Sequence, residues 1–149
     1  MAAAYTYTDA RFREGTLPGG GGFGAFFANV AIAGKYVPLV PEHKANLTAS
    51  WLFMPKTRLS AAVSYVASQF MDNDEANTLG VKIPAYTVVD LKLAHERGPW
   101  RLTAAVNNLF DRKYFNYAVR SNQVAAADRY NAYPLPQTNG AVTLEYAFK

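Results

Sequence analysis

Hydrophobic and polar residues alternate along most of this chain, which is the pattern of β-strands with one apolar and one polar face. Residues 44–53 show it most clearly, with an apolar face of Ala45, Leu47, Ala49, Trp51 and Phe53 and a polar face of Lys44, Asn46, Thr48 and Ser50. The same alternation predicts strands at residues 59–68, 86–94, 100–107 and 142–148, and a weaker first strand at residues 2–12. The sequence therefore predicts an all-β fold of about six meandering antiparallel strands.

The two faces of these strands differ in a way that favours a membrane environment. On the last five strands the apolar faces carry no charged residue, and the opposite faces are mostly Ser, Thr, Asn and Ala. A soluble sandwich also alternates, but its solvated face is usually richer in Lys and Glu. Strands of about 9–11 residues, apolar outside and small and polar inside, are what an outer-membrane β-barrel requires. The pattern thus indicates part of an antiparallel transmembrane β-barrel.

The connections and the aromatic residues support the same interpretation. Tight links at residues 54–57 and 96–99 alternate with long ones at roughly 13–42, 71–84 and 108–137, as in barrels with short periplasmic turns and long extracellular loops. If the tight links are periplasmic, an aromatic group gathers at the periplasmic ends of the strands, on the apolar face: Trp51, Phe53, Trp100, Tyr146 and Phe148. An aromatic girdle at the membrane interface explains this placement.

Composition narrows the classes of function. The chain has 149 residues, a net charge of +4 with scattered Lys and Arg, and no Cys, which argues against nucleic-acid binding, a disulfide framework and thiol catalysis. No apolar run approaches 18 residues, so no transmembrane helix is expected, and residues 1–8 lack the basic start and apolar run of a signal peptide. No catalytic constellation stands out, so we expect no enzyme activity, no cofactor and no resident metal ion.

Three stretches resemble the barrel of TonB-dependent outer-membrane receptors. One is the run NNLFDRKY, which matches the family pattern NLFD-x-x-Y and contains Asn107, Asn108, Leu109, Phe110, Asp111 and Tyr114. The others are P-x-Y-x-x-x-D at Pro84, Tyr86 and Asp90, and the loop 37–43 before an earlier strand. In order and approximate spacing they match the family over residues 5–148. The alternation of the last strand resembles the terminal signal that the barrel-assembly machinery reads, Val142, Leu144, Tyr146 and Phe148, although Lys149 follows it.

The resemblance implies the C-terminal part of a plugged barrel of the 22-stranded type, with residues 1–149 as one incomplete domain and the plug absent. Such receptors lie in the outer membrane of Gram-negative bacteria and import ferric siderophores or similar scarce solutes with energy from the TonB coupling complex. Because about eight strands are needed to close a barrel, we expect a fragment that does not transport alone. The implied partners are outer-membrane lipid, a ferric siderophore or similar ligand, the TonB complex and the barrel-assembly machinery, with no nucleic acid.

The segment 114–133 holds the best candidates for ligand contacts. It offers aromatic and cationic side chains that suit stacking and charge pairing with an anionic, aromatic ferric chelate, namely Tyr114, Tyr117, Arg120, Arg129, Tyr130 and Tyr133. For NNLFDRKY itself a structural role is favoured, in which Asn and Asp cap the end of a strand. Phe110 and Tyr114 would then lie in the outer aromatic girdle.

Other motifs lack the context that their chemistry needs. Gly19, Gly21 and Gly24 match G-x-G-x-x-G, but no helix follows, which favours a flexible loop over a phosphate site. Residues 72–75 resemble the start of a calcium loop without its later Gly and Glu, which favours a solvated loop tip. His43 and His95 have no metal-ligand partner at a useful spacing.

Two alternatives remain open on the sequence alone. A complete small outer-membrane barrel with a structural or adhesive role would need eight strands, two of them hidden in the weak segments 26–37 and 112–120. A soluble, lipocalin-like barrel would turn the apolar faces inward and bind its ligand there.

Overall fold

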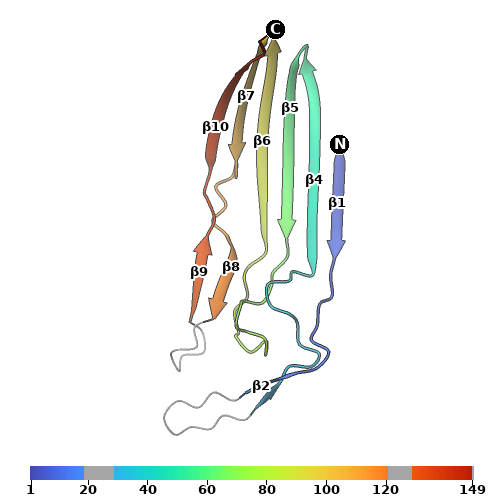
Figure 1. Cartoon of the computed structure of the whole chain (residues 1–149), viewed down its shortest axis with the longest axis vertical. Coiled ribbons are helices and arrows are strands. Elements are labelled where there is room, and N and C mark those ends of the chain that lie inside the picture. The colour runs from blue at the N-terminus through green and yellow to red at the C-terminus, as the bar shows by residue number, and fades with distance from the viewer. Residues whose placement is uncertain (19–28, 121–128, 149) are drawn as a thin grey trace.

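One antiparallel sheet of six strands organises the chain (Figure 1), and the computed structural model describes residues 1–18, 29–120 and 129–148. The sheet order is β1 (Ala2–Tyr7), β4 (His43–Met54), β5 (Thr57–Val66), β6 (Tyr86–Arg97), β7 (Trp100–Asn107) and β10 (Asn139–Tyr146). Two small sheets pair β2 (Thr16–Leu17) with β3 (Val30–Ala31) and β8 (Phe115–Arg120) with β9 (Tyr130–Pro134). Over these ranges the chain forms no helix that could cross a membrane.

The prediction of six antiparallel strands is confirmed; β5 and β6 differ from the predicted bounds by two or three residues, and the largest differences are at the two ends of the chain. The first strand ends at Tyr7 because the following residues bond to the 35–42 connection, as in Thr8 N–H to the Glu42 carbonyl at 2.9 Å. The last strand spans Asn139–Tyr146 rather than 142–148 because its partner β7 begins at Trp100, opposite Tyr146.

The sheet is open in the part of the chain that the structure describes. Its edge strands β1 and β10 do not pair with each other. The weak segments 26–37 and 112–120 do contain β3 and β8, but both strands lie in the separate two-stranded sheets and do not widen the large one. The eight-stranded barrel and the lipocalin-like barrel both require closure, so neither alternative describes this fold.

Strand register brings the apolar positions onto one continuous face of the sheet. Across the strands the paired residues form uncharged rows, of which the central four are Ala45–Tyr65–Thr87, Leu47–Val63–Val89, Ala49–Ala61–Leu91–Val106 and Trp51–Leu59–Leu93–Ala104–Val142. Because side chains alternate between faces along a strand, the Ser, Thr and Asn positions form the opposite face. There short polar side chains bond across strands, as Ser50 and Ser60 do at 2.9 Å.

The two ends of the sheet differ in their connections (Figure 1). At one end, which we call the turn end, two-residue links join β4 to β5 and β6 to β7. Lys56 and Gly98 in these links have φ of 61° and 60°, and a positive φ is what tight turns of this kind need. The described parts of the long connections lie at the opposite end, the loop end.

Aromatic residues border the apolar face at both ends. At the turn end the rings of Trp100 and Tyr146 lie 4.7 Å apart and those of Tyr146 and Phe148 4.8 Å apart, and Trp51 packs on Phe53 at 5.7 Å. Near the loop end Tyr5, Tyr7 and His43 form a second group on the same face, with the Tyr5 hydroxyl 2.8 Å from His43 Nδ1. The turn-end group was predicted from the sequence, whereas for the outer girdle the sequence suggested Phe110 and Tyr114 and not Tyr5, Tyr7 and His43.

Candidate functional site

The buried core of the described chain lies among the long connections rather than in the sheet. Residues 67–85 pack against the β8–β9 hairpin, and together we call them the loop cluster. Its centre consists of Met71, Leu79, Ile83 and Ala118, and Leu39 and Phe115 pack around them. Since burial of apolar side chains is the main source of stability, these two connections support each other.

Asp72 pairs with the edge of β8 that β9 leaves free. Asp72 forms a parallel bridge with Val119. The Asp72 N–H donates to the Ala118 carbonyl at 2.9 Å, and the Arg120 N–H donates to the Asp72 carbonyl at 2.8 Å. This pairing satisfies backbone groups that an edge strand would otherwise leave open.

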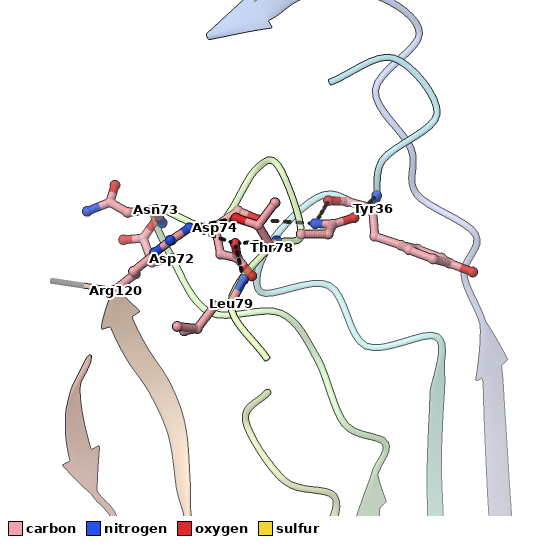
Figure 2. Close-up of polar contacts among 8 residues, drawn as sticks. Tyr36, Asp72, Asn73, Asp74, Thr78, Leu79 and Arg120 are labelled. Atoms are coloured by element: carbon pink, nitrogen blue, oxygen red, sulfur yellow. Dashed lines mark hydrogen bonds and ion pairs between the residues drawn. The ribbon is translucent and has the colours of Figure 1, made fainter. Parts of the chain in front are cut away.

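Asp74 is the polar centre of the loop cluster (Figure 2), and none of its side chain is exposed. Its Oδ1 accepts hydrogen bonds from the N–H groups of Thr78 at 2.9 Å and Leu79 at 3.0 Å. Arg120 reaches over from β8 and donates from Nη1 to the same oxygen at 3.2 Å, and to Thr78 Oγ1 at 2.9 Å. A buried carboxylate requires this kind of pairing, because an uncompensated charge is costly in the interior.

The expected solvated tip at residues 72–75 is therefore wrong for Asp74. Its carboxylate turns inward because Arg120, distant in sequence, supplies the compensating charge. Within the described ranges no three His, Cys, Asp or Glu side chains come together as metal ligands.

Asn77 joins a third segment to the loop cluster. Its side chain makes a reciprocal pair with the backbone of Tyr36: the Tyr36 N–H donates to Oδ1 at 2.7 Å, and Nδ2 donates to the Tyr36 carbonyl at 3.0 Å. Nδ2 also donates to the Asp74 carbonyl at 3.0 Å. The connections before β4, before β6 and before β10 are thus tied into one polar network.

The predicted ligand residues fall into separate groups. Tyr117 and Tyr133 form an exposed pair of rings at 5.4 Å, which we call the tyrosine pair, and Tyr130 packs on Phe115 at 6.3 Å. Arg120 is committed to Asp74, so its charge is already compensated. Arg129 is exposed directly before β9, whereas the Tyr114 ring packs against that of Tyr86 at 4.6 Å.

The hydroxyl of Tyr117 is held by a carboxylate. It donates to Asp72 Oδ2 at 2.8 Å. This hydrogen bond, with smaller contributions from desolvation and from the negative charge of Asp72, raises the pKa of Tyr117 above its ordinary value near 10. The phenol therefore stays protonated, and stays a donor, over the whole physiological range.

The two motifs NNLFDRKY and P-x-Y-x-x-x-D meet in space. Asp90 Oδ1 accepts a hydrogen bond from the Asn108 N–H at 2.8 Å, and the rings of Tyr86 and Tyr114 lie 4.6 Å apart. Asn108 in turn pairs its side chain with the backbone of Arg112. These contacts close the loop-end terminus of β7 against β6, which is a capping role.

Sequence reasoning missed a column of cations and rings at the loop end. The Arg11 guanidinium lies 3.9 Å from the centre of the Tyr36 ring, and the Lys82 ammonium lies 4.0 Å from that of Phe70. The two rings stack at 5.8 Å. Nothing in the local sequence marks this column, because its members come from three different connections.

Some predictions fall outside the described residues. These are the glycines Gly19, Gly21 and Gly24, the residues 121–128 of the expected ligand segment, and Lys149.

Comparison with known proteins matches this chain to a family. Residues 1–109 match the family model described as TonB dependent receptor-like, beta-barrel. The metal-pseudopaline receptor CntO of Pseudomonas aeruginosa (strain UCBPP-PA14) is 31% identical over 137 residues, which cover 88% of this chain and 17% of that protein. The CntO protein of strain PAO1 is 29% identical, with the same coverage. The chain therefore spans only about a sixth of the length of these relatives.

Solved receptors share the fold of the sheet. The siderophore receptor PiuA from Acinetobacter baumannii superposes with a TM-score of 0.62 at 24% identity, over 76% of this chain and 14% of that one. The ferric-catecholate import receptor Fiu from E. coli K12 gives 0.61 at 22%, over 79% and 17%. The ferric yersiniabactin uptake receptor FyuA from Yersinia pestis gives 0.60 at 22%, over 80% and 20%.

Members of this family are outer-membrane β-barrels that serve as transport receptors and not as enzymes. They bind ferric siderophores or metals and couple to TonB. The match over residues 1–109, the uncharged face of the sheet and the superposition on solved receptors agree with one another. The chain belongs to the TonB-dependent receptor family and forms part of such a β-barrel.

Proposed function

We propose that this chain is the C-terminal part of the barrel of an outer-membrane receptor that takes up a metal chelate, with the loop end outside the cell. The observation that carries the proposal is the uncharged face of the sheet between two aromatic groups, since lipid-facing barrel surfaces have this form. Residues 1–149 would be one incomplete domain, and transport would belong to the complete receptor.

The spacing of the aromatic groups fits a membrane. On β4, His43 and Trp51 are eight residues apart, which is about 27 Å along a strand. At a strand tilt of about 40° this is about 20 Å along the membrane normal, close to the apolar band of about 25 Å in outer-membrane barrels. Outer-membrane lipid is thus the expected partner of this face.

The ligand class rests on two further observations. The curated relatives are named as receptors for metal–pseudopaline, and solved relatives as receptors for ferric siderophores. At the loop end this chain exposes the tyrosine pair and Tyr130, with Arg129 beside them. Rings of this kind stack on the planar parts of a chelate, and a free guanidinium pairs with its anionic groups.

Two protein partners are part of the proposal. Energy would come from the TonB complex, which contacts parts of the receptor outside residues 1–149. The alternating residues of β10 and the aromatic side chains that follow it would be read by the barrel-assembly machinery.

Uptake of defined chelates tests the function. Cells that carry the complete receptor are compared with a deletion strain for accumulation of radiolabelled metal–pseudopaline, ferric yersiniabactin and ferric catecholate. We expect uptake of at least one chelate, lost both in the deletion strain and in a strain without TonB. If the deletion strain took up each of the three chelates as well as the cells that carry the receptor do, the proposal would be contradicted.

The ligand surface has its own test. Tyr130 and Tyr133 are exposed, and the described contacts of their side chains are with other rings. In the complete receptor the double variant Tyr130→Ala, Tyr133→Ala should weaken binding of the transported chelate by roughly tenfold or more, the loss of one or two stacking contacts. Phe110→Ala is the matched control, because Phe110 is a 74% exposed ring outside β8 and β9 for which the described contacts include no other ring.

A further inference from the structure

Two carboxylates fix the position of the β8–β9 hairpin. Asp74 holds Arg120 from the buried side of the hairpin, and Asp72 holds Tyr117 through its hydroxyl. The two acidic residues lie in one connection and their two partners in another, and the members of each pair are 45 and 46 positions apart in the sequence. Figure 2 shows Arg120 reaching from the end of β8 toward this acidic segment.

The two contacts differ in what holds them. The Asp74 side chain is fully buried and Arg120 is largely covered, so separating them would leave a charge without compensation in a low-dielectric site. The Tyr117–Asp72 bond is more exposed and fixes one ring rather than the whole hairpin. Between them, backbone hydrogen bonds join Asp72 to Ala118 and Arg120.

These contacts position the tyrosine pair, which is exposed at the surface. Tyr117 and Tyr133 lie opposite each other on β8 and β9. Because the hydroxyl of Tyr117 is anchored, its ring presents a fixed face next to that of Tyr133. A rigid aromatic surface binds a planar partner with less loss of conformational entropy than a mobile one.

We propose that Asp72 and Asp74 are positioning residues of the ligand site, which hold the tyrosine pair in place for stacking on the ring system of the chelate. The inference rests on the proposed function, since it assumes that the pair contacts ligand. It adds that different residues would bind the planar and the anionic parts of the chelate. The local charge of Arg120 is already offset by Asp74, so this part of the site would bind the planar portion of a chelate and leave its anionic portion to Arg129 or to residues elsewhere.

The test uses the complete receptor with Asp74→Asn, Asp72→Asn and Tyr117→Phe. Asp74→Asn keeps an oxygen for the Thr78 and Leu79 N–H groups and removes the charge that holds Arg120. Tyr117→Phe keeps the ring and removes only the anchored hydroxyl. Glu75→Gln is the matched control, because it neutralises a neighbouring carboxylate for which the described contacts include no hydrogen bond or ion pair.

Two readouts are needed. The first is hydrogen exchange at the amides of Asp72 and Arg120 without ligand, which reports whether the two connections are held together. The second is uptake of whichever labelled chelate the wild-type receptor transports, analysed as half-saturation concentration and maximal rate per receptor on the cell surface. A merely structural defect lowers the amount of receptor and leaves the half-saturation concentration unchanged.

In Asp74→Asn we expect faster exchange at both amides and a half-saturation concentration raised about tenfold, with an unchanged maximal rate per receptor. Tyr117→Phe and Asp72→Asn should raise the half-saturation concentration by about threefold with little change in exchange. Glu75→Gln should match wild type in both readouts.

Three results would overturn the inference, and they are distinguishable. Unchanged exchange in Asp74→Asn would show that the carboxylate does not hold the hairpin. Faster exchange with an unchanged half-saturation concentration would remove the positioning role and leave the proposed function intact. Failure of the wild-type receptor to take up any of the three chelates would overturn the proposed function first, and this inference with it.

Discussion

At the scale of single residues, Asn108 shows how one side chain can close the end of a strand. It is 3% exposed and has a φ of 51°, a left-handed conformation that Asn tolerates better than most residues. Its Oδ1 accepts from the Arg112 N–H at 2.8 Å, and its Nδ2 donates to the Arg112 carbonyl at 2.9 Å. Its own N–H donates to Asp90.

Replacing Asn108 with Ala should therefore destabilise this end of the sheet. The variant leaves the N–H and the carbonyl of Arg112 without the Asn108 side chain as partner. It also places an Ala in a left-handed backbone conformation, which Ala tolerates less well than Asn. Together these two effects should cost about 2–4 kcal/mol of stability. Hydrogen exchange at the Arg112 amide should become about 30-fold faster or more. Asn108→Gly separates the loss of the hydrogen bonds from the cost of the left-handed backbone, because Gly adopts this conformation without strain. It should therefore lose less stability than Asn108→Ala. An equal loss in both variants would show that the backbone conformation contributes nothing.

At the scale of elements, we expect substitutions in the two tight hairpins to change stability in opposite directions. Gly98 has a φ of 60°, and a Cβ at this position would meet no atom within 4 Å. The cost of Gly98→Ala is therefore the left-handed backbone alone, about 1–2 kcal/mol. In the other hairpin the left-handed residue is Lys56, the second residue of its link rather than the first, with a φ of 61°. Lys56→Gly should therefore gain about 0.5–1 kcal/mol after the entropy cost of Gly.

Equilibrium unfolding of the complete receptor in lipid vesicles measures both changes. A loss of stability in Lys56→Gly would mean that the Lys56 side chain contributes more than the strain of its backbone. Equal and small effects in both variants would mean that the turns do not limit the stability of their hairpins.

The elements also show what sequence alone can and cannot predict. Six strands followed from alternation because a period of two depends only on nearby residues, and the register then placed Ala61 beside Leu91 as an apolar face requires. The contact of Asp74 with Arg120 spans 46 residues, and that of Tyr36 with Asn77 spans 41. Such pairs depend on how two irregular connections fold over each other, which no periodicity encodes.

The candidate site follows the same division. Tyr117 and Tyr133 were named from their residue types, and the structure places them together. Arg120 was named for its charge, yet that charge is offset by an aspartate that looked like a solvated residue. The acidic run at residues 72–75 and Arg120 in another connection were compatible with many pairings. The sequence therefore identified candidate residues but not which of them form a pair.

At the scale of the whole molecule, the decisive property is which face of the sheet meets lipid. Two adjacent alanines on β5 report on it directly. Ala61 lies in the central uncharged row with Ala49 and Leu91, whereas Ala62 pairs with Thr48 and Asp90 on the polar face. They are the same residue type in the same strand, one residue apart, so a Lys at either position differs mainly in the environment of its charge.

In the complete receptor, Ala61→Lys should cost about 2–4 kcal/mol of unfolding free energy in lipid vesicles, the penalty for a cation near the middle of the lipid-facing surface. Ala62→Lys should cost less than about 1 kcal/mol, because its ammonium has water and the Asp90 carboxylate within reach. The comparison is made in the same vesicles and with the same denaturant. The reverse order would mean that the apolar face packs inside the protein, in which case the aromatic groups at its two ends would be core residues and not membrane anchors. Since the outer-membrane assignment rests on this face, the pair of variants tests that assignment without any knowledge of the ligand.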